Sequence, residues 1–188
     1  MAEGVFGRMR RDDSVLLVVD IQERLLPAMD GHEEVAAAAD RLVRAAGLLG
    51  VPVLCTEQYP RGLGATVDPV RTSLGPAPIL EKMTFSCCGA EGLMGRLASL
   101  GRRQVVLAGI ETHVCVMQTA LDLLAAGYRP FVAADGVSSR FAADRQTALD
   151  RLRQAGAVVT TSESVMFEWL ETAAAAEFKA VSRIVRER

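Results

Sequence analysis

The chain has 188 residues, of which 50% are apolar and 23% are charged. This length and this ordinary soluble, globular composition predict one domain over residues 1–188 with a substantial core of its own. The 21 basic and 23 acidic side chains nearly balance and form no basic stripe, so we expect no nucleic-acid partner. No apolar run is long enough to cross a bilayer, so we expect a cytoplasmic protein without a membrane partner.

The chain begins with residues 1–13, which carry arginines and acids but no apolar run and are expected to form an exposed arm. Short runs rich in valine and leucine then alternate with helical patterns. The runs predict strands at 15–19, 51–55, 105–108, 130–133 and 157–160, with a brief sixth at 79–80. The helical patterns cover 33–49, 92–100, 116–126 and 140–154. This alternation predicts an α/β fold: three layers, α/β/α, around a mostly parallel sheet of about six strands.

Residues typical of helix ends support these predicted elements. Four glycines stand where the four helices should end: Gly50, Gly101, Gly127 and Gly156. Ser162 is a candidate N-cap for a further helix through Leu170, and 173–188 reads as a last helix. The region 57–78 is rich in proline and glycine and is expected to be an irregular lid or binding loop.

Polar residues after the strands are the first candidates for a site, because parallel sheets bind ligands beyond the carboxyl ends of their strands. Five residues meet this test: Asp20, Glu57, Lys82, Cys115 and Asp135. An ammonium favours thiolate over thiol, and a carboxylate can take the thiol proton and return it to a leaving group. Taken singly, Asp20 and Asp135 also fit turn residues, and Lys82 a solvated charge.

Cys115 follows a predicted strand and precedes a helical pattern, which places it at a helix N-terminus. Unpaired amides and the helix dipole lower a thiol pKa there, so we expect a reactive thiolate; a small buried core residue is the alternative. The remaining cysteines, Cys55, Cys87 and Cys88, and the two histidines show no zinc-site spacing. We expect no metal, no cofactor and no disulfide, with Cys55 in the core.

Five segments carry a resemblance to a known family: VVDIQERL, TEQYPRGLG, EKMTFS, GIETHVCV and TALDLLAAGY. In this order, within 14–166, they resemble the isochorismatase-like cysteine hydrolase superfamily, and most of all its isochorismatase domain-containing group. The resemblance implies a catalytic triad of Asp20, Lys82 and Cys115. It also implies a cis peptide between Ile110 and Glu111, with the amides of Glu111 and Cys115 forming an oxyanion hole.

Differences between this sequence and two better-known branches of the superfamily indicate which reaction to expect. Nicotinamidases bind a metal through an Asp-x-His element and further histidines after the second strand, whereas this chain has Glu57-Gln58-Tyr59-Pro60 there. Some isochorismatases protonate a vinyl ether and lack the cysteine, which this chain keeps. We therefore expect a hydrolase that cleaves an amide-type C–N bond of a small molecule through a Cys115 thioester. A vinyl ether hydrolase and a catalytically silent scaffold are the alternatives.

Further residues are candidates for the substrate pocket: Gln22, Gln58, Tyr59, Phe85 and His113. Tyr59 and Phe85 fit the core equally well, Gln22 a helix surface, and His113 a structural role. Glu81 is expected at the surface or in an ion pair. The resemblance implies a homo-oligomer, a dimer or larger, and the apolar positions in 116–124 and 173–185 offer faces to bury.

Overall fold

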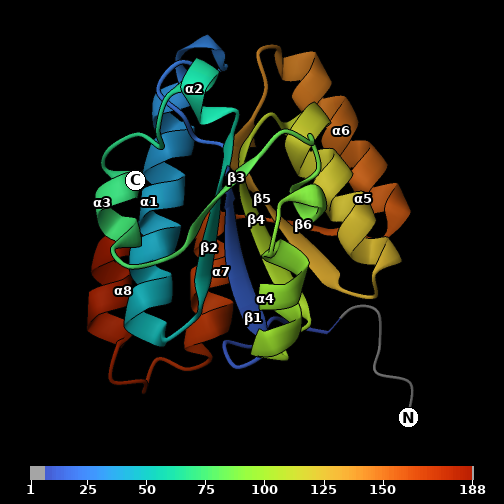
Figure 1. The fold of residues 1–188 in the computed structure, drawn as a ribbon. Helices are drawn as coiled ribbons and strands as arrows, with labels where there is room; N and C mark the ends of the chain where they lie inside the picture. The colour runs from blue at the N-terminus through green and yellow to red at the C-terminus, as the bar shows by residue number, and fades with distance from the viewer. Residues whose placement is uncertain (1–6, 188) are drawn as a thin grey trace.

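The computed structural model describes residues 7–187, which build a three-layer α/β fold (Figure 1). One six-stranded sheet has the order β3-β2-β1-β4-β5-β6, and every neighbouring pair is parallel. The strands are β1 (Ser14–Val19), β2 (Val53–Gln58), β3 (Ile79–Lys82), β4 (Gln104–Ile110), β5 (Arg129–Ser138) and β6 (Val158–Thr160). The expected α/β class with about six strands is confirmed, and the sheet is parallel throughout.

Helices cover both faces of the sheet. Figure 1 shows α1 (His32–Leu49), α3 (Val70–Leu74), α7 (Ser162–Leu170) and α8 (Phe178–Val185) on one face. The opposite face carries α4 (Leu93–Leu100), α5 (Met117–Ala125) and α6 (Ala142–Ala155). The short α2 (Pro60–Leu63) follows β2, and three single turns complete the set: η1 (Leu26–Ala28), η2 (Cys87–Gly89) and the π-helical η3 (Thr112–Val116). None of the described helices is long and apolar enough to cross a membrane.

The central strand β1 explains why both faces need helices. Leu16 and Val18 join the core beneath α1 and α7, whereas Leu17 joins the core beneath α4, α5 and α6. All three side chains are fully buried. Burial of each such side chain stabilises the fold by about 1.5–3 kcal/mol, so an apolar run without alternation is what a doubly covered strand requires.

Several predicted boundaries move. The second strand begins at Val53 rather than at 51 and continues to Gln58, and β5 continues to Ser138, so Glu57 and Asp135 lie inside strands. The helices expected at 92–100 and 140–154 lie at Leu93–Leu100 and Ala142–Ala155. Pairing with neighbouring strands extends β2 and β5 through polar residues that carry no apolar signal.

The region 57–78 is not irregular throughout, because it contains α2 and α3. Val70 and Leu74 of α3 are buried in the core beside α1. The buried Glu57 carboxylate accepts hydrogen bonds from Thr66 N at 2.7 Å and from Thr66 Oγ1 at 2.8 Å, which fastens the segment to β2. The region expected to be an irregular lid or binding loop is therefore partly helical and packed against the core, and its residues Tyr59, Pro60 and Arg61 line a cavity.

The last helix is shorter than expected, and the N-terminal arm is described only in part. Residues 1–6 of the expected arm and residue 188 lie outside the described residues. Within the described part of the arm, residues 7, 8 and 10–12 are exposed, whereas Met9 is fully buried and its amide donates to the Glu168 carboxylate. The last helix covers only Phe178–Val185, and its Val181 and Ile184 pack into the core of the same chain.

Helix caps are mostly as predicted. Gly50, Gly101 and Gly156 end their helices in left-handed conformation, as does Gly127 just after α5. The N-cap of α7 is Thr161, whose hydroxyl accepts from Ser164 N, rather than Ser162. Ser162 instead donates its amide and hydroxyl to the Asp135 carboxylate at 2.7 and 2.6 Å, so Asp135 anchors this helix to β5 and is not a turn residue.

The chain reverses its direction of winding between β1 and β4, and this switch point places their carboxyl ends side by side. Gly109 of β4 pairs with Val19 of β1 at a φ of 134°. A Cβ there would lie 2.0 Å from the Val19 carbonyl oxygen, so only glycine permits this approach. The segments after β1 and β4 are thereby held against each other.

Candidate active site

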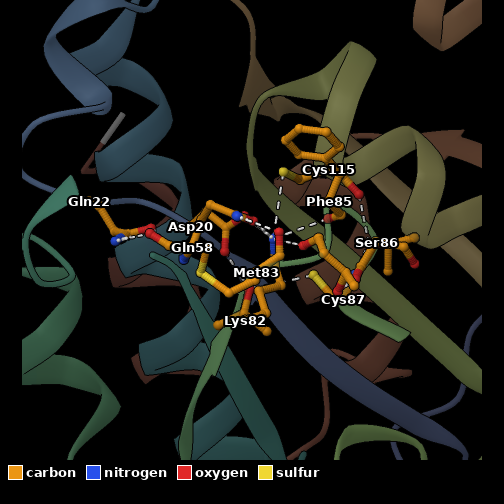
Figure 2. A network of polar contacts seen from close by, with 12 residues as sticks. Asp20, Gln22, Gln58, Lys82, Met83, Phe85, Ser86, Cys87 and Cys115 are labelled. Carbon is orange, nitrogen blue, oxygen red and sulfur yellow. Dashed lines mark hydrogen bonds and ion pairs between the residues drawn. The ribbon is translucent and has the colours of Figure 1, made fainter. Parts of the chain in front are cut away.

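The side chains of Asp20, Lys82 and Cys115 meet at the carboxyl edge of the sheet (Figure 2). Asp20 follows β1, Lys82 is the last residue of β3, and Cys115 lies in η3 after β4. The Lys82 Nζ lies 2.7 Å from Asp20 Oδ2 and 3.6 Å from Cys115 Sγ. The structure thus brings together the acid, the ammonium and the thiol that the sequence singles out.

The Lys82 ammonium is enclosed by acceptors. Its nitrogen donates to Gln58 Oε1 at 2.6 Å and to the carbonyl oxygens of Phe85 and Thr84 at 3.0 and 3.2 Å. The side chain has no exposed surface. Burial lowers the pKa of Lys82, but the charge of Asp20 and the nearby thiols outweigh it, so the pKa is raised and the ammonium stays charged.

Asp20 is fully buried and has a left-handed φ of 52°, a conformation that aspartate tolerates better than most residues. Its Oδ1 accepts from Thr56 Oγ1 at 2.8 Å, whereas Oδ2 has the ion pair with Lys82 and, among the described residues, no well-directed hydrogen bond. Burial raises the pKa of Asp20, although the Lys82 charge opposes this. The carboxylate is therefore a stronger base than an exposed aspartate.

Cys115 lies within the π-helical turn η3, immediately before α5, and is 5% exposed. Burial and the Asp20 charge raise the pKa of its thiol to about 12, against the opposing effect of Lys82. The expected low pKa is therefore wrong, because desolvation of the thiolate outweighs the neighbouring ammonium. The resting group is a thiol that must lose its proton as it reacts.

A second layer of residues behind the triad has no counterpart in the sequence prediction. Thr119 Oγ1 donates to the Cys115 carbonyl oxygen at 2.6 Å and accepts from Cys87 N at 2.8 Å. The fully buried Cys87 thiol lies 3.4 Å from Thr56 Oγ1, and burial raises its pKa to about 12. The only sequence signal for this layer is a threonine in an apolar strand and another one helical turn after Cys115. Cys55 is fully buried, as expected.

The two glutamines predicted to line the substrate pocket, Gln22 and Gln58, make different contacts. Gln58 contacts the Lys82 ammonium directly. Gln22 is fully buried, and its side-chain amide forms hydrogen bonds with the backbone of Gln58 and with the Gly64 carbonyl oxygen. It is therefore neither a helix-surface residue nor open to solvent. Its isolated bridge to Thr66 is antiparallel. Gln22 therefore fixes the segment around the site.

Two predicted aromatic residues stand at the surface near Lys82. Tyr59 is 47% exposed and Phe85 is 56% exposed, which excludes the core alternative for both. Tyr59 lines a cavity of about 370 Å³ together with Lys82 and Met83. Glu81, which also lines this cavity, is exposed as expected. This cavity offers room for a small ligand beside the end of β3.

The η3 turn is attached to the segment after β5. Arg140 Nε donates to the Glu111 carboxylate at 3.0 Å, and His113 Nδ1 lies 2.9 Å from Ser139 Oγ. The contact with Ser139 gives His113 a structural role, since it joins η3 to the segment after β5. The peptide bond between Ile110 and Glu111 is cis. Within residues 7–187, no group of three or more His, Cys, Asp or Glu side chains is arranged to hold a metal ion.

The sequence profile of the Isochorismatase domain matches residues 14–164, which include Asp20, Lys82 and Cys115. The chain belongs to the isochorismatase family. It is 40% identical over 187 residues to Isochorismatase domain-containing protein 2A of Mus musculus, with 99% of this chain and 89% of the relative covered. It is 38% identical to Isochorismatase domain-containing protein 1 of Salmo salar, but spans only 64% of that relative's length while 97% of this chain is covered.

Two solved structures are similar to this chain along most of its length. A MAR1 ribonuclease from Caenorhabditis elegans matches with a TM-score of 0.90 at 36% identity, covering 96% of this chain and 93% of that one. The YcaC gene product of Escherichia coli, described as an octameric hydrolase of unknown specificity, matches with a TM-score of 0.85 at 25% identity, covering 89% and 84%. The chain is therefore an isochorismatase-like hydrolase in family and fold.

Proposed function

We propose that this protein is a cysteine hydrolase that cleaves an amide-type C–N bond of a small molecule through a thioester on Cys115. The observation that carries the proposal is the convergence of Asp20, Lys82 and Cys115 in one buried cluster. Nucleophile, base and fixed charge are the three parts that acyl transfer requires.

Acylation begins with the thiol, because the raised pKa of Cys115 leaves little free thiolate. Cys115 Sγ attacks the substrate carbonyl carbon while Asp20 takes the thiol proton. We assign this proton to Asp20 Oδ2, because Thr56 already donates to Oδ1 whereas Oδ2 has the ion pair with Lys82 and accepts no hydrogen bond from the described residues. Lys82 keeps its proton throughout and offsets the negative charge that the cluster carries.

The tetrahedral intermediate then collapses. We assign its oxyanion to the backbone amides of Glu111 and Cys115, which belong to η3 and the residue before it. Asp20 returns its proton to the substrate nitrogen, the C–N bond breaks, and an amine leaves. Water next attacks the thioester, its proton passes through Asp20 to the sulfur, and the carboxylic acid leaves the regenerated thiol.

A hydrolysis screen tests this proposal with amides, ureido compounds, isochorismate and a short RNA, since the C. elegans relative is described as a ribonuclease. We expect turnover of an amide or ureido compound, an acyl adduct on Cys115 in quenched intact-mass spectra, and loss of both in Cys115→Ala. Cys88→Ser is the matched control, because this half-buried thiol lies outside the triad. Normal turnover by Cys115→Ala without an adduct on the wild type refutes the thioester.

Vinyl ether hydrolysis is a second candidate, favoured by one observation. A buried carboxyl with a raised pKa can donate a proton to a carbon as well as accept one from a thiol. In that reaction Asp20 would act without Cys115. Isochorismate turnover that survives Cys115→Ala but not Asp20→Asn selects this chemistry over amide hydrolysis.

We also propose that the chain self-associates, as the E. coli relative is described as an octamer. The faces expected to be buried between subunits are partly used within the chain, since Val116, Val181 and Ile184 are core residues. Exposed apolar side chains lie elsewhere, at Met83 (71% exposed) and Phe141 (67% exposed). These are the surfaces that an assembly would cover.

A further inference from the structure

The amide side chain of Gln58 connects the triad lysine to the adjoining backbone. Its Oε1 lies 2.6 Å from Lys82 Nζ, closer than Asp20 Oδ2 at 2.7 Å, and its Nε2 donates to the Met83 carbonyl oxygen at 2.9 Å. The amide is thus held at both ends and cannot rotate without breaking one of the two hydrogen bonds. Its oxygen offers Lys82 a fixed acceptor.

Gln22 in turn immobilises Gln58. Its Oε1 accepts from Gln58 N at 2.7 Å, and its Nε2 donates to the Gln58 and Gly64 carbonyl oxygens at 3.0 and 2.7 Å. Both donors of this fully buried amide are satisfied, and its acceptor is in use. Because Gln22 lies two residues after Asp20, the end of β2 is fixed relative to the triad carboxylate.

A flexible lysine needs such a partner. The ammonium has three protons for four hydrogen-bond acceptors, namely Gln58 Oε1, two carbonyl oxygens and Cys115 Sγ, and it also forms the ion pair with Asp20. Without the Gln58 acceptor the buried cation is less well solvated. It then either loses its proton more readily or shifts toward the carbonyl oxygens, and both changes weaken its support of a thiolate.

We propose that Gln58, clamped by Gln22, is a positioning residue that holds the Lys82 ammonium between Asp20 and Cys115. The groups that face the Cys115 thiol with charge or a titratable proton are Asp20 after β1, Lys82 of β3 and Cys87 of η2. Gln58 is neutral, so it acts on the thiol only through Lys82. The kinetic part of this inference rests on the proposed function, whereas the thiol chemistry does not.

The primary test is Gln58→Met, which keeps the length of the side chain and removes both hydrogen-bonding groups. We expect the rate of Cys115 alkylation by iodoacetamide, followed by peptide mass spectrometry across neutral to alkaline pH, to fall by about tenfold at each pH below the thiol pKa. With a hydrolysed amide, kcat falls by about tenfold or more while KM changes by less than about threefold. Gln154→Met, an exposed change on α6, leaves both unchanged.

Gln22→Met completes a double-variant cycle. If Gln22 acts through Gln58, adding Gln22→Met to Gln58→Met lowers the alkylation rate by less than about twofold further. Alkylation profiles of Gln58→Met and wild type that coincide overturn the proposal, and so do single-variant effects that simply multiply. If Gln22→Met does not fold, the profile of Gln58→Met alone decides. If the wild type hydrolyses no amide, the proposed function fails while the alkylation result still stands.

Discussion

Replacing Lys82 by methionine tests the electrostatics of the site without any substrate. Methionine fills a similar volume but leaves Asp20, which is fully buried, without its counter-charge. Burial then raises the pKa of Asp20 further above its ordinary value of 3.8. The folded variant therefore holds Asp20 as the neutral acid, and at neutral pH it must take up a proton on folding.

The loss of stability in Lys82→Met follows from this uptake of a proton by Asp20 on folding. The folded state binds more protons than the unfolded state at every pH between the ordinary and the raised pKa, so stability falls as pH rises through this window. A pH near 7 is about three units above the ordinary pKa of Asp20. At about 1.4 kcal/mol per unit, the free energy of unfolding of Lys82→Met falls by up to about 4 kcal/mol. Near pH 5 the same reasoning gives about 1.5 kcal/mol.

Urea unfolding near both pH values, followed by the fluorescence of the buried Trp169, measures the free energy of unfolding. Lys179→Met is the matched control, since this lysine is exposed on α8, and it should behave as wild type. Adding Asp20→Asn to Lys82→Met should remove most of the pH dependence. A loss in Lys82→Met that is equal at the two pH values, or one that Asp20→Asn does not relieve, refutes the reasoning.

Three further outcomes are expected. In the wild type, the alkylation rate of Cys115 keeps rising beyond the ordinary thiol pKa of 9.0, because burial raises the pKa to about 12; a plateau below pH 9 contradicts this. Chelation with EDTA leaves hydrolysis unchanged, because the Lys82 ammonium already neutralises Asp20 and repels a cation; loss on chelation and recovery with zinc, iron or manganese would count against this. Sedimentation at micromolar protein shows a dimer or larger assembly that Phe141→Ser weakens, whereas a monomeric wild type refutes self-association.

The sequence by itself determines most of the fold. Valine- and leucine-rich runs alternate with helical patterns because each strand is covered on both faces, and the glycines after the helices adopt the left-handed conformations predicted for them. The same local patterns place Asp20, Lys82 and Cys115 at the carboxyl edge, because parallel strands end on one side. Motif resemblance adds the chemistry that those three residues share.

Only the tertiary structure decides what surrounds these groups. The helix position of Cys115 predicts a low pKa, yet burial beside Asp20 raises it, and burial depends on segments far apart in the sequence. Likewise, polar residues such as Gln22 give no local sign that they are buried, because their partners come from the folded segment after β2. Periodicity and spacing record which way a side chain faces, whereas desolvation and hydrogen bonding depend on which distant atoms meet it.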